Sequence, residues 1–352
     1  MLINNSTLVE HVFPEDRTGR SMSKPPQSAE DRLIGRFFRP LATAPGALGL
    51  IDDAAALTPP RGCDLVLTTD GVIAGVHFFP DDPPGDIARK ALRMNLSDLA
   101  AKGARPLGFL LSLALPANTD ETWLSAFAAG LGDDAIQYGC PLLGGDTDRT
   151  PGLTSVSIAA FGAVPKGTMV RRSTAKPGDC VLVTGTIGDA ALGVKLRGDP
   201  SLAERWKLTD AATASLLQRY LLPQPRSALA KAILSTASAA IDISDGLVGD
   251  LAKLCDASAV AADIDVSAVP LSSAARMAVT TVPGLLETAL TGGDDYEIAL
   301  TLPSAKLADF QAAARAANVG VTDIGRIQAG DGARFMHYGR ALTFARASYS
   351  HF

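Results

Sequence analysis

The chain has 352 residues, of which 47% are hydrophobic and 20% charged, so it is long and apolar enough for two domains with a core each. Its formal net charge of -5 excludes a general basic surface for nucleic acid or an anionic membrane. The sequence has no apolar run of the roughly 18–20 residues that span a bilayer and no apolar signal-peptide core, so we expect a cytoplasmic protein.

The first half of the chain predicts a leader and one domain. Residues 1–27 are polar and end in Lys24-Pro25-Pro26, which is typical of a flexible leader. A helix-start signal follows at Ser28. Periodicity then predicts strands at 64–70, 106–115, 141–143 and 155–164, and helices at 86–101 and 121–138.

The alternation of helices and strands begins again after Pro165-Lys166-Gly167, which predicts domains at 28–165 and 166–352. The second domain is expected to have strands at 180–185, 239–243 and 298–302, and helices at 229–238, 247–255 and 304–317. Elements that alternate in this way indicate two α/β or α+β domains, each with a sheet packed against helices.

Aspartates recur beside glycines and hydroxyl residues at the ends of apolar strands and inside one apolar helix, where aspartate is uncommon. A single one of them would most simply be a helix cap or a turn former. The whole set is harder to explain in that way: Asp52, Asp53, Asp70, Asp98, Asp146, Asp242 and Asp245. Two of the segments, 68–72 and 243–247, share a hydroxyl-Asp-Gly pattern after a strand.

Converging carboxylates would raise one another's pKa unless cations neutralised them. Ligands that are all oxygen favour a hard cation, so the pattern predicts a site for several divalent ions, with Mg²⁺ or Mn²⁺ as the natural partner. Magnesium bridges carboxylates to nucleotide phosphates, which allows an acidic protein to bind a triphosphate. The P-loop, the protein-kinase motifs and GxGxxG are absent. The residues by themselves therefore indicate a two-domain protein with a multi-magnesium site, and they name no substrate.

From about residue 29 to Phe352, the sequence resembles the thiamine-monophosphate kinase family. That family lies within the superfamily of aminoimidazole ribonucleotide synthetase and selenophosphate synthetase. The order and spacing of the matching segments are specific: 51–55, 68–70, 75–78, 95–100, 144–147, 172–173, 176–179, 243–247, 292–297 and 349–352. The first acidic motif departs from the family pattern, because Ile51 stands where the family has glycine.

The resemblance implies a role for each matching position. Asp98, Asp146 and Asp245 would be catalytic, and Gly145, Asp146, Arg172 and Ser244 would contact ATP. His77, Asp294 and Tyr349 would line the thiamine phosphate pocket. The implied magnesium ligands are Asp53, Thr68, Thr69, Asp70, Asp98, Asp146, Asp242 and Asp245.

The resemblance also implies two domains of the aminoimidazole ribonucleotide synthetase-like type, with the active site in the cleft between them and the N-terminal domains paired in a homodimer. The expected reaction is direct transfer of the γ-phosphoryl group of ATP to thiamine monophosphate, with the help of several Mg²⁺ ions, as the last step of thiamine diphosphate biosynthesis. Three alternatives remain open at this point: another ATP-using enzyme of the superfamily, a noncatalytic nucleotide- or thiamine phosphate-binding protein, and a metal-dependent phosphohydrolase.

Overall fold

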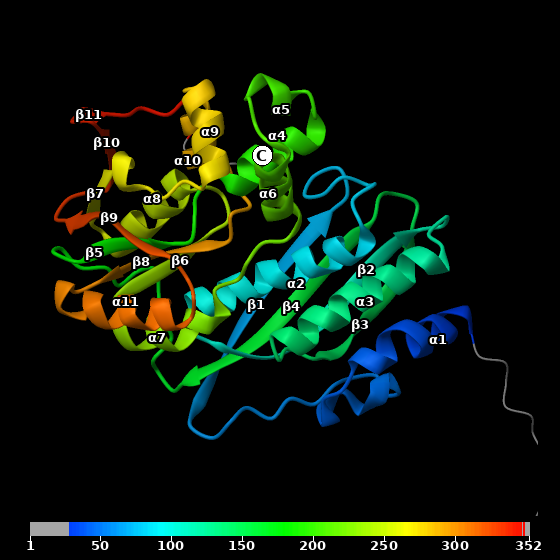
Figure 1. The fold of residues 1–352 in the computed structure, drawn as a ribbon. Coiled ribbons are helices and arrows are strands. Elements are labelled where there is room, and N and C mark those ends of the chain that lie inside the picture. Colours follow the sequence, from blue (N-terminus) through cyan, green and yellow to red (C-terminus); the bar gives the residue numbers. More distant parts are fainter. Residues whose placement is uncertain (1–27, 347, 349–352) are drawn as a thin grey trace, which may run out of the picture.

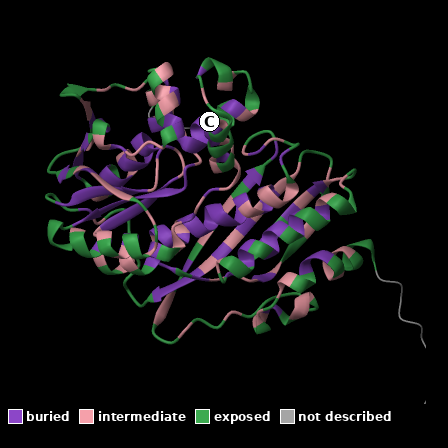
Figure 2. Cartoon of the chain, viewed as in Figure 1, coloured by how far each residue is buried: buried purple, intermediate pink, exposed green. Residues whose placement is uncertain are grey.

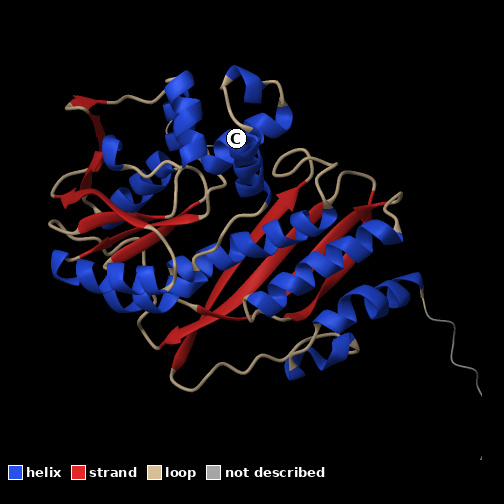
Figure 3. Cartoon of the chain, viewed as in Figure 1, coloured by secondary structure: helices blue, strands red, loops and turns tan. Residues whose placement is uncertain are grey.

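The computed structural model describes residues 28–346 and 348. The expected leader and Tyr349 lie outside the described residues. Two sheets with their helices make up the molecule, and Figures 1 and 3 show them side by side. None of the described helices has the length and apolar character needed to cross a membrane.

The N-terminal sheet has four strands in the order β1-β4-β2-β3, and only the β2–β3 pair is parallel. The bounds are β1 Cys63–Ile73, β2 Arg105–Pro116, β3 Leu142–Thr150 and β4 Ser155–Pro165. The helices α2 (Pro84–Ala101) and α3 (Glu121–Gln137) cover one face (Figure 1). Because side chains alternate along a strand, Val66 and Val72 face the core, while Leu65 and Leu67 lie on the other face.

The chain enters this domain through α1 (Ala29–Leu33), followed by short π and 3-10 helices at Ile34–Phe38, Arg39–Leu41 and Pro45–Leu50. The expected helix start is confirmed. Ser28 and Asp31 form a capping box, in which each side chain accepts the other's backbone N–H. Residues 34–50 then pack against α3 and β3.

The strand expected at 141–143 is longer than predicted. β3 continues through Gly145 and Asp146 to Thr150, because it pairs in parallel with β2, with Asp146 opposite Ser112. The polar, glycine-rich sequence does not predict this extension, which the backbone hydrogen bonds of β2 stabilise. Asp146 therefore lies within a strand, and so does Asp70 in β1.

The C-terminal sheet has seven strands in the order β11-β10-β7-β9-β5-β8-β6, with only β7 and β10 parallel. The bounds are β5 Cys180–Thr184, β6 Ala239–Ile243, β7 Ala261–Asp265, β8 Glu297–Leu302, β9 Val321–Gln328, β10 Gly332–His337 and β11 Arg340–Ala341. β5 is buried throughout: Val181 and Val183 join one core cluster and Leu182 the other. The sheet is therefore covered on both faces.

The helices α8 (Leu247–Ser258) and α10 (Leu285–Thr291) contribute to the core on one face of this sheet, and α7 (Ala230–Thr236) and α11 (Leu307–Ala316) to that on the other. A further cluster joins helices that periodicity did not predict, because they are short and alanine-rich. These are α4 Asp189–Gly198, α5 Leu202–Arg205, α6 Asp210–Leu221 and α9 Ser273–Thr281. Short 3-10 turns complete this half at Ser227–Leu229, Val266–Ala268 and Ser304–Lys306.

The helix α2 connects the two halves of the molecule. Its N-terminal part packs in the first core, whereas Ala100 and Ala101 pack in the core of the second sheet. Most of α2 is buried, as Figure 2 shows. Polar side chains of α2 are thus held between a strand of each sheet, β1 and β6.

Candidate active site between the two sheets

β6 and the turn that follows it carry three of the predicted residues: Asp242 lies within β6, and Ser244 and Asp245 lie in the turn before α8. Gly246 has φ +112° in this turn, and a Cβ there would come within 2.6 Å of the carbonyl carbon of Thr291. The backbone N–H of Asp245 donates to Asp250 Oδ2 at 2.9 Å. The buried Asp250 on α8 therefore fixes the turn and holds Asp245 at the start of that helix.

Across from this turn, β1 presents Thr68 and Asp70 to α2. The Thr68 hydroxyl donates to Asp98 Oδ2 on α2. The backbone N–H of Asp70 donates to the side chain of the fully buried Asn95, also on α2, at 3.1 Å. Both strand residues lie on the same face because they are two positions apart.

The aspartates of these elements share one electrostatic environment. Burial raises the pKa of Asp70 from 3.8 to about 7, and the carboxylates of Asp98 and Asp245 add to the shift. Burial raises the pKa of Asp242 well above its usual value, with Asp98 and Asp250 contributing. Because the charged forms of these groups disfavour one another, a bound cation would relieve the repulsion.

Two lysines lie against this cluster. Lys253 Nζ pairs with Asp245 Oδ2 and, at 2.8 Å, with Asp250 Oδ1. Lys102 Nζ donates to the carbonyl of Ala240 at 2.9 Å, and burial lowers its pKa. Within the described ranges, no three acidic, histidine or cysteine side chains form a complete metal-ligand set. The carboxylate and hydroxyl donors fit a hard cation that takes further ligands from phosphate and water.

Two cavities meet at the cluster, and both are lined by Asp98, Asp242, Ser244 and Asp245. One, of about 500 Å³, adds four cations to these carboxylates and to Asp250, namely Lys102, Arg171, Arg172 and Lys253, and is called the cationic cavity below. The other, of about 450 Å³, is lined by Asp70, His77, Met94, Asp294 and Tyr296 among others. The arrangement can hold a polyanion on one side of the carboxylates and a second ligand on the other.

The second cavity contains the two described residues that were predicted to bind the acceptor. His77 Nδ1 accepts the backbone N–H of Ile73 at 3.1 Å, so the ring is held by the end of β1. Asp294 adopts φ +74° in the loop between α10 and β8, and its N–H donates to the carbonyl of Ser244 at 2.8 Å. The two predicted acceptor residues therefore come from both halves of the chain.

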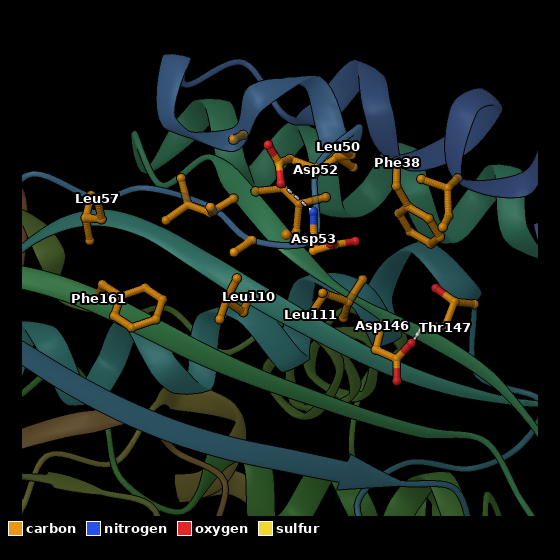
Figure 4. A pocket seen from close by; sticks show the side chains of 18 of the residues that line it. Phe38, Leu50, Asp52, Asp53, Leu57, Leu110, Leu111, Asp146, Thr147 and Phe161 are labelled. Atoms are coloured by element: carbon orange, nitrogen blue, oxygen red, sulfur yellow. Dashed lines mark hydrogen bonds between the residues drawn. The ribbon is translucent and has the colours of Figure 1, made fainter. Parts of the chain in front are cut away.

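Asp53, Gly145 and Asp146 line a different cavity of about 640 Å³, on the opposite face of the N-terminal sheet. Figure 4 shows Asp53 on a loop and Asp146 on β3 on either side of this cavity. Thr69 faces away from Thr68, because adjacent residues of a strand alternate, and its hydroxyl donates to the carbonyl of Ile158 at 3.1 Å. The described structure thus groups Thr68, Asp70, Asp98, Asp242 and Asp245, and it places Asp53 and Asp146 at another cavity.

The structure explains why residue 145 is a glycine, which the sequence did not reveal. A Cβ at this position would lie 1.8 Å from the carbonyl oxygen of Leu111 on β2. The glycine is therefore required for the close approach of the two parallel strands. Its predicted contact with ATP remains a prediction.

Five charged residues of the site were missed in the sequence: Lys90, Lys102, Arg171, Asp250 and Lys253. Lys90, Asp250 and Lys253 lie on helices that also pack in a core, and Lys102 is the C-cap residue of α2. A charge on or next to an apolar helix was the available signal for these four. Asp250 and Lys253 stand one helical turn apart and follow Asp245 closely, so their spacing could have indicated a shared site.

The comparisons with known proteins agree with this architecture. The family models described as AIR synthase related protein, N-terminal domain and C-terminal domain match residues 51–164 and 176–337. The thiamine-monophosphate kinase of Caulobacter vibrioides is 38% identical over 353 residues, which cover 99% of this chain and 97% of that protein.

Two solved structures are also similar. The crystal structure of thiamine-monophosphate kinase from Stenotrophomonas maltophilia K279a has a TM-score of 0.77 and 38% identity, covering 89% of this chain and 96% of that one. The AaThiL protein complexed with AMPPCP and TMP has a TM-score of 0.72 and 30% identity, covering 87% and 97%. With its two AIR synthase related domains, this chain belongs to the thiamine-monophosphate kinase family.

Proposed function

We propose that this protein is a kinase that transfers the γ-phosphoryl group of ATP to the phosphate of thiamine monophosphate, giving thiamine diphosphate. One observation carries the proposal: the cationic cavity and the cavity of His77 and Asp294 share the walls formed by Asp98, Asp242, Ser244 and Asp245. A donor in the first cavity and an acceptor in the second would meet at the carboxylates. The relative that was solved with both AMPPCP and TMP supports this assignment.

The triphosphate would lie in the cationic cavity, where Arg172 and Arg171 supply guanidinium groups and Lys102 and Lys253 supply ammonium groups. Ser244 lines the same cavity. Gly145 and Asp146, which the resemblance also assigns to ATP, line the cavity on the opposite face of the N-terminal sheet, so the place proposed here for the triphosphate does not account for their contact with ATP. Thiamine monophosphate would bind beside His77 and Asp294, and we retain Tyr349 as a third contact.

Asp70, Asp98, Asp242 and Asp245, with the Thr68 hydroxyl, are the residues that would hold Mg²⁺ in the shared wall. Asp53, Thr69 and Asp146 are also proposed as Mg²⁺ ligands, but they lie on the opposite face of the N-terminal sheet. Bound magnesium would neutralise charge on the phosphates during transfer. The protein's own part is to bind both phosphates in line and to exclude water.

The acceptor phosphate is already largely ionised at neutral pH, so no strong general base is required. Asp98, Asp146 and Asp245 remain the proposed catalytic residues.

We also propose a homodimer formed through the outer face of the N-terminal sheet. That face exposes large apolar side chains, including Leu67 at 64% and Ile73 at 43%, with Leu65 and Leu110 beside them. A row of exposed leucines on a sheet is typical of an interface. A molecular mass in solution equal to that of a single chain would overturn the dimer.

We place the reaction in the cytoplasm, where ATP is supplied.

The test is to incubate the purified protein with ATP, Mg²⁺ and thiamine monophosphate and to follow thiamine diphosphate by chromatography. Thiamine and a sample without acceptor serve as controls. We expect product only when both Mg²⁺ and the monophosphate are present. Phosphate release without an acceptor would indicate a phosphohydrolase, and ATP binding without product would indicate a sensor or another ATP enzyme of the superfamily.

A further inference from the structure

Lys90 is a buried cation on α2, and its ammonium group has a partner on every side. Its side chain is only 3% exposed. Its Nζ donates to Asp294 Oδ2 at 2.7 Å and to the carbonyl of His77 at 3.0 Å, and it lies 4.3 Å from the ring centroid of Tyr220. Two hydrogen bonds and one aromatic face thus satisfy the three N–H groups of the ammonium.

An ammonium group in such a place is costly. Removing it from water opposes folding by several kcal/mol, which its partners must offset, and an apolar side chain would fill the same space without that cost. The contacts made by Lys90 are also selective. They go to His77 and Asp294, the two described residues assigned to the acceptor cavity, and those residues come from different halves of the chain.

The surrounding network fixes Lys90 itself. The Tyr220 hydroxyl donates to Asp82 Oδ2 at 2.6 Å, and the backbone N–H of Phe79 donates to the same oxygen at 2.9 Å. Arg197 Nε donates to Asp82 Oδ1 at 2.7 Å. The segment after His77 is therefore joined to α4 and α6, and the Tyr220 ring is held against Lys90.

Asp294 depends on this support in two ways. Its backbone is in the left-handed region at φ +74°, which residues with a Cβ adopt rarely and which neighbouring contacts must hold. Its carboxylate is 27% exposed, and within the described part of the chain Lys90 is the only cation that pairs with it. The pair has no net charge, so Asp294 meets a ligand as a fixed hydrogen-bond acceptor and not as an uncompensated anion.

We propose that Lys90 is a positioning residue for the acceptor pocket: it holds the Asp294 carboxylate and the His77 segment in the geometry that recognises the acceptor, without touching the acceptor itself. This inference rests on the proposed function, because it takes thiamine monophosphate as the ligand of that cavity. It predicts that removing the ammonium weakens acceptor recognition while nucleotide binding, on the other side of the carboxylates, is retained.

The experiment compares Lys90→Met with Arg89→Met. Arg89 is the neighbouring residue on α2, and it pairs with Asp86 and Asp133 outside both cavities. We expect K90M to raise the KM for thiamine monophosphate about tenfold to a hundredfold, with less than about threefold change in kcat and in the KM for ATP. R89M should leave all three constants near those of the wild type. Equal changes in both KM values, or an unchanged KM for thiamine monophosphate, would overturn the proposal.

A double variant tests whether the effect passes through Asp294. Since K90M leaves the partly buried Asp294 carboxylate without its cation, K90M/D294N removes both charges and keeps an amide oxygen as acceptor. If Lys90 acts through Asp294, the double variant should bind thiamine monophosphate no worse than D294N alone. If the two substitutions instead weaken the binding of thiamine monophosphate independently, so that their factors multiply in the double variant, Lys90 does not act through Asp294. If K90M alone does not fold, the double variant can still be compared with D294N, because neither protein has an unpaired carboxylate at position 294.

Calorimetric titration with thiamine monophosphate and, separately, with AMPPCP distinguishes the two hypotheses. A wild type that binds thiamine monophosphate but forms no product would refute the proposed reaction, while the binding of K90M would still decide the role of Lys90. A wild type that does not bind thiamine monophosphate overturns both.

Discussion

The raised pKa of Asp70 makes the stability of the metal-free protein depend on pH. Asp70 lies on β1 beneath α2, where burial and the carboxylates of Asp98 and Asp245 raise its pKa to about 7. Asp70→Asn keeps the shape of the side chain and cannot ionise. We expect this substitution to stabilise the metal-free protein at pH 8, because it removes a charge that the folded state disfavours.

The sign follows from linkage. In the folded state Asp70 holds its proton up to about pH 7, whereas in the unfolded chain it loses the proton near 3.8. Ionisation therefore lowers the free energy of unfolding progressively between these values, and the loss is complete above pH 7. A pKa difference of this size corresponds to at most about 4 kcal/mol. The D70N variant should show this gain at pH 8, a smaller gain at pH 5 and little of it below about pH 4.

Urea denaturation in EDTA at several pH values between 5 and 8.5 measures the effect. Asp148→Asn is the matched control, since Asp148 is an exposed carboxylate on β3. Adding Mg²⁺ and AMPPCP should favour the wild type again, because it would bind them better. The reasoning is refuted if D70N is no more stable than the wild type at pH 8, or if its gain is the same at every pH.

Three further predictions concern single side chains. Asp98→Asn should keep the thermal midpoint within a few degrees and lose at least about a hundredfold in thiamine diphosphate formation, because the amide lacks the charge for a shared cation; near-normal turnover would contradict the multi-metal proposal. Asp294→Ala should raise the KM for thiamine monophosphate more than that for ATP, and equal effects in steady-state kinetics would remove it from the acceptor pocket. Gly145→Ala should lower the free energy of unfolding by about 1–3 kcal/mol because its Cβ would meet the β2 backbone. Its control is Gly144→Ala, whose Cβ would meet only the Leu110 side chain at 3.3 Å; equal stability of the two variants in urea would contradict this reason.

Much of the fold follows from local sequence signals. The strand expected at 239–243 has those bounds as β6, and the Ser28 capping box begins α1 as predicted. These elements are determined by short-range periodicity and by cap chemistry, which a single sequence contains. The short helices around α4 and α6 were not predicted, because they are short and their apolar side chains, alanines among them, pack mainly against one another.

The acidic site was predictable as a set of residue types, and part of its assembly was too. The shared pattern at 68–72 and 243–247 indicated related positions, and Asp70 and Asp245 do lie close enough for their charges to interact. The predicted metal ligands nevertheless divide between two faces of one sheet. Which face a residue occupies depends on strand register, and β3 gained its length from pairing with β2.

The sequence alone determined many of the elements, the family resemblance and the carboxylates that carry the proposed chemistry. Only the tertiary structure decided which of these carboxylates meet, why Gly145 is a glycine, and that Lys90 pairs with Asp294 across 204 positions of the chain. The physical reason is that helix and strand preferences act over a few residues, whereas the desolvation of a charge depends on every element that packs around it.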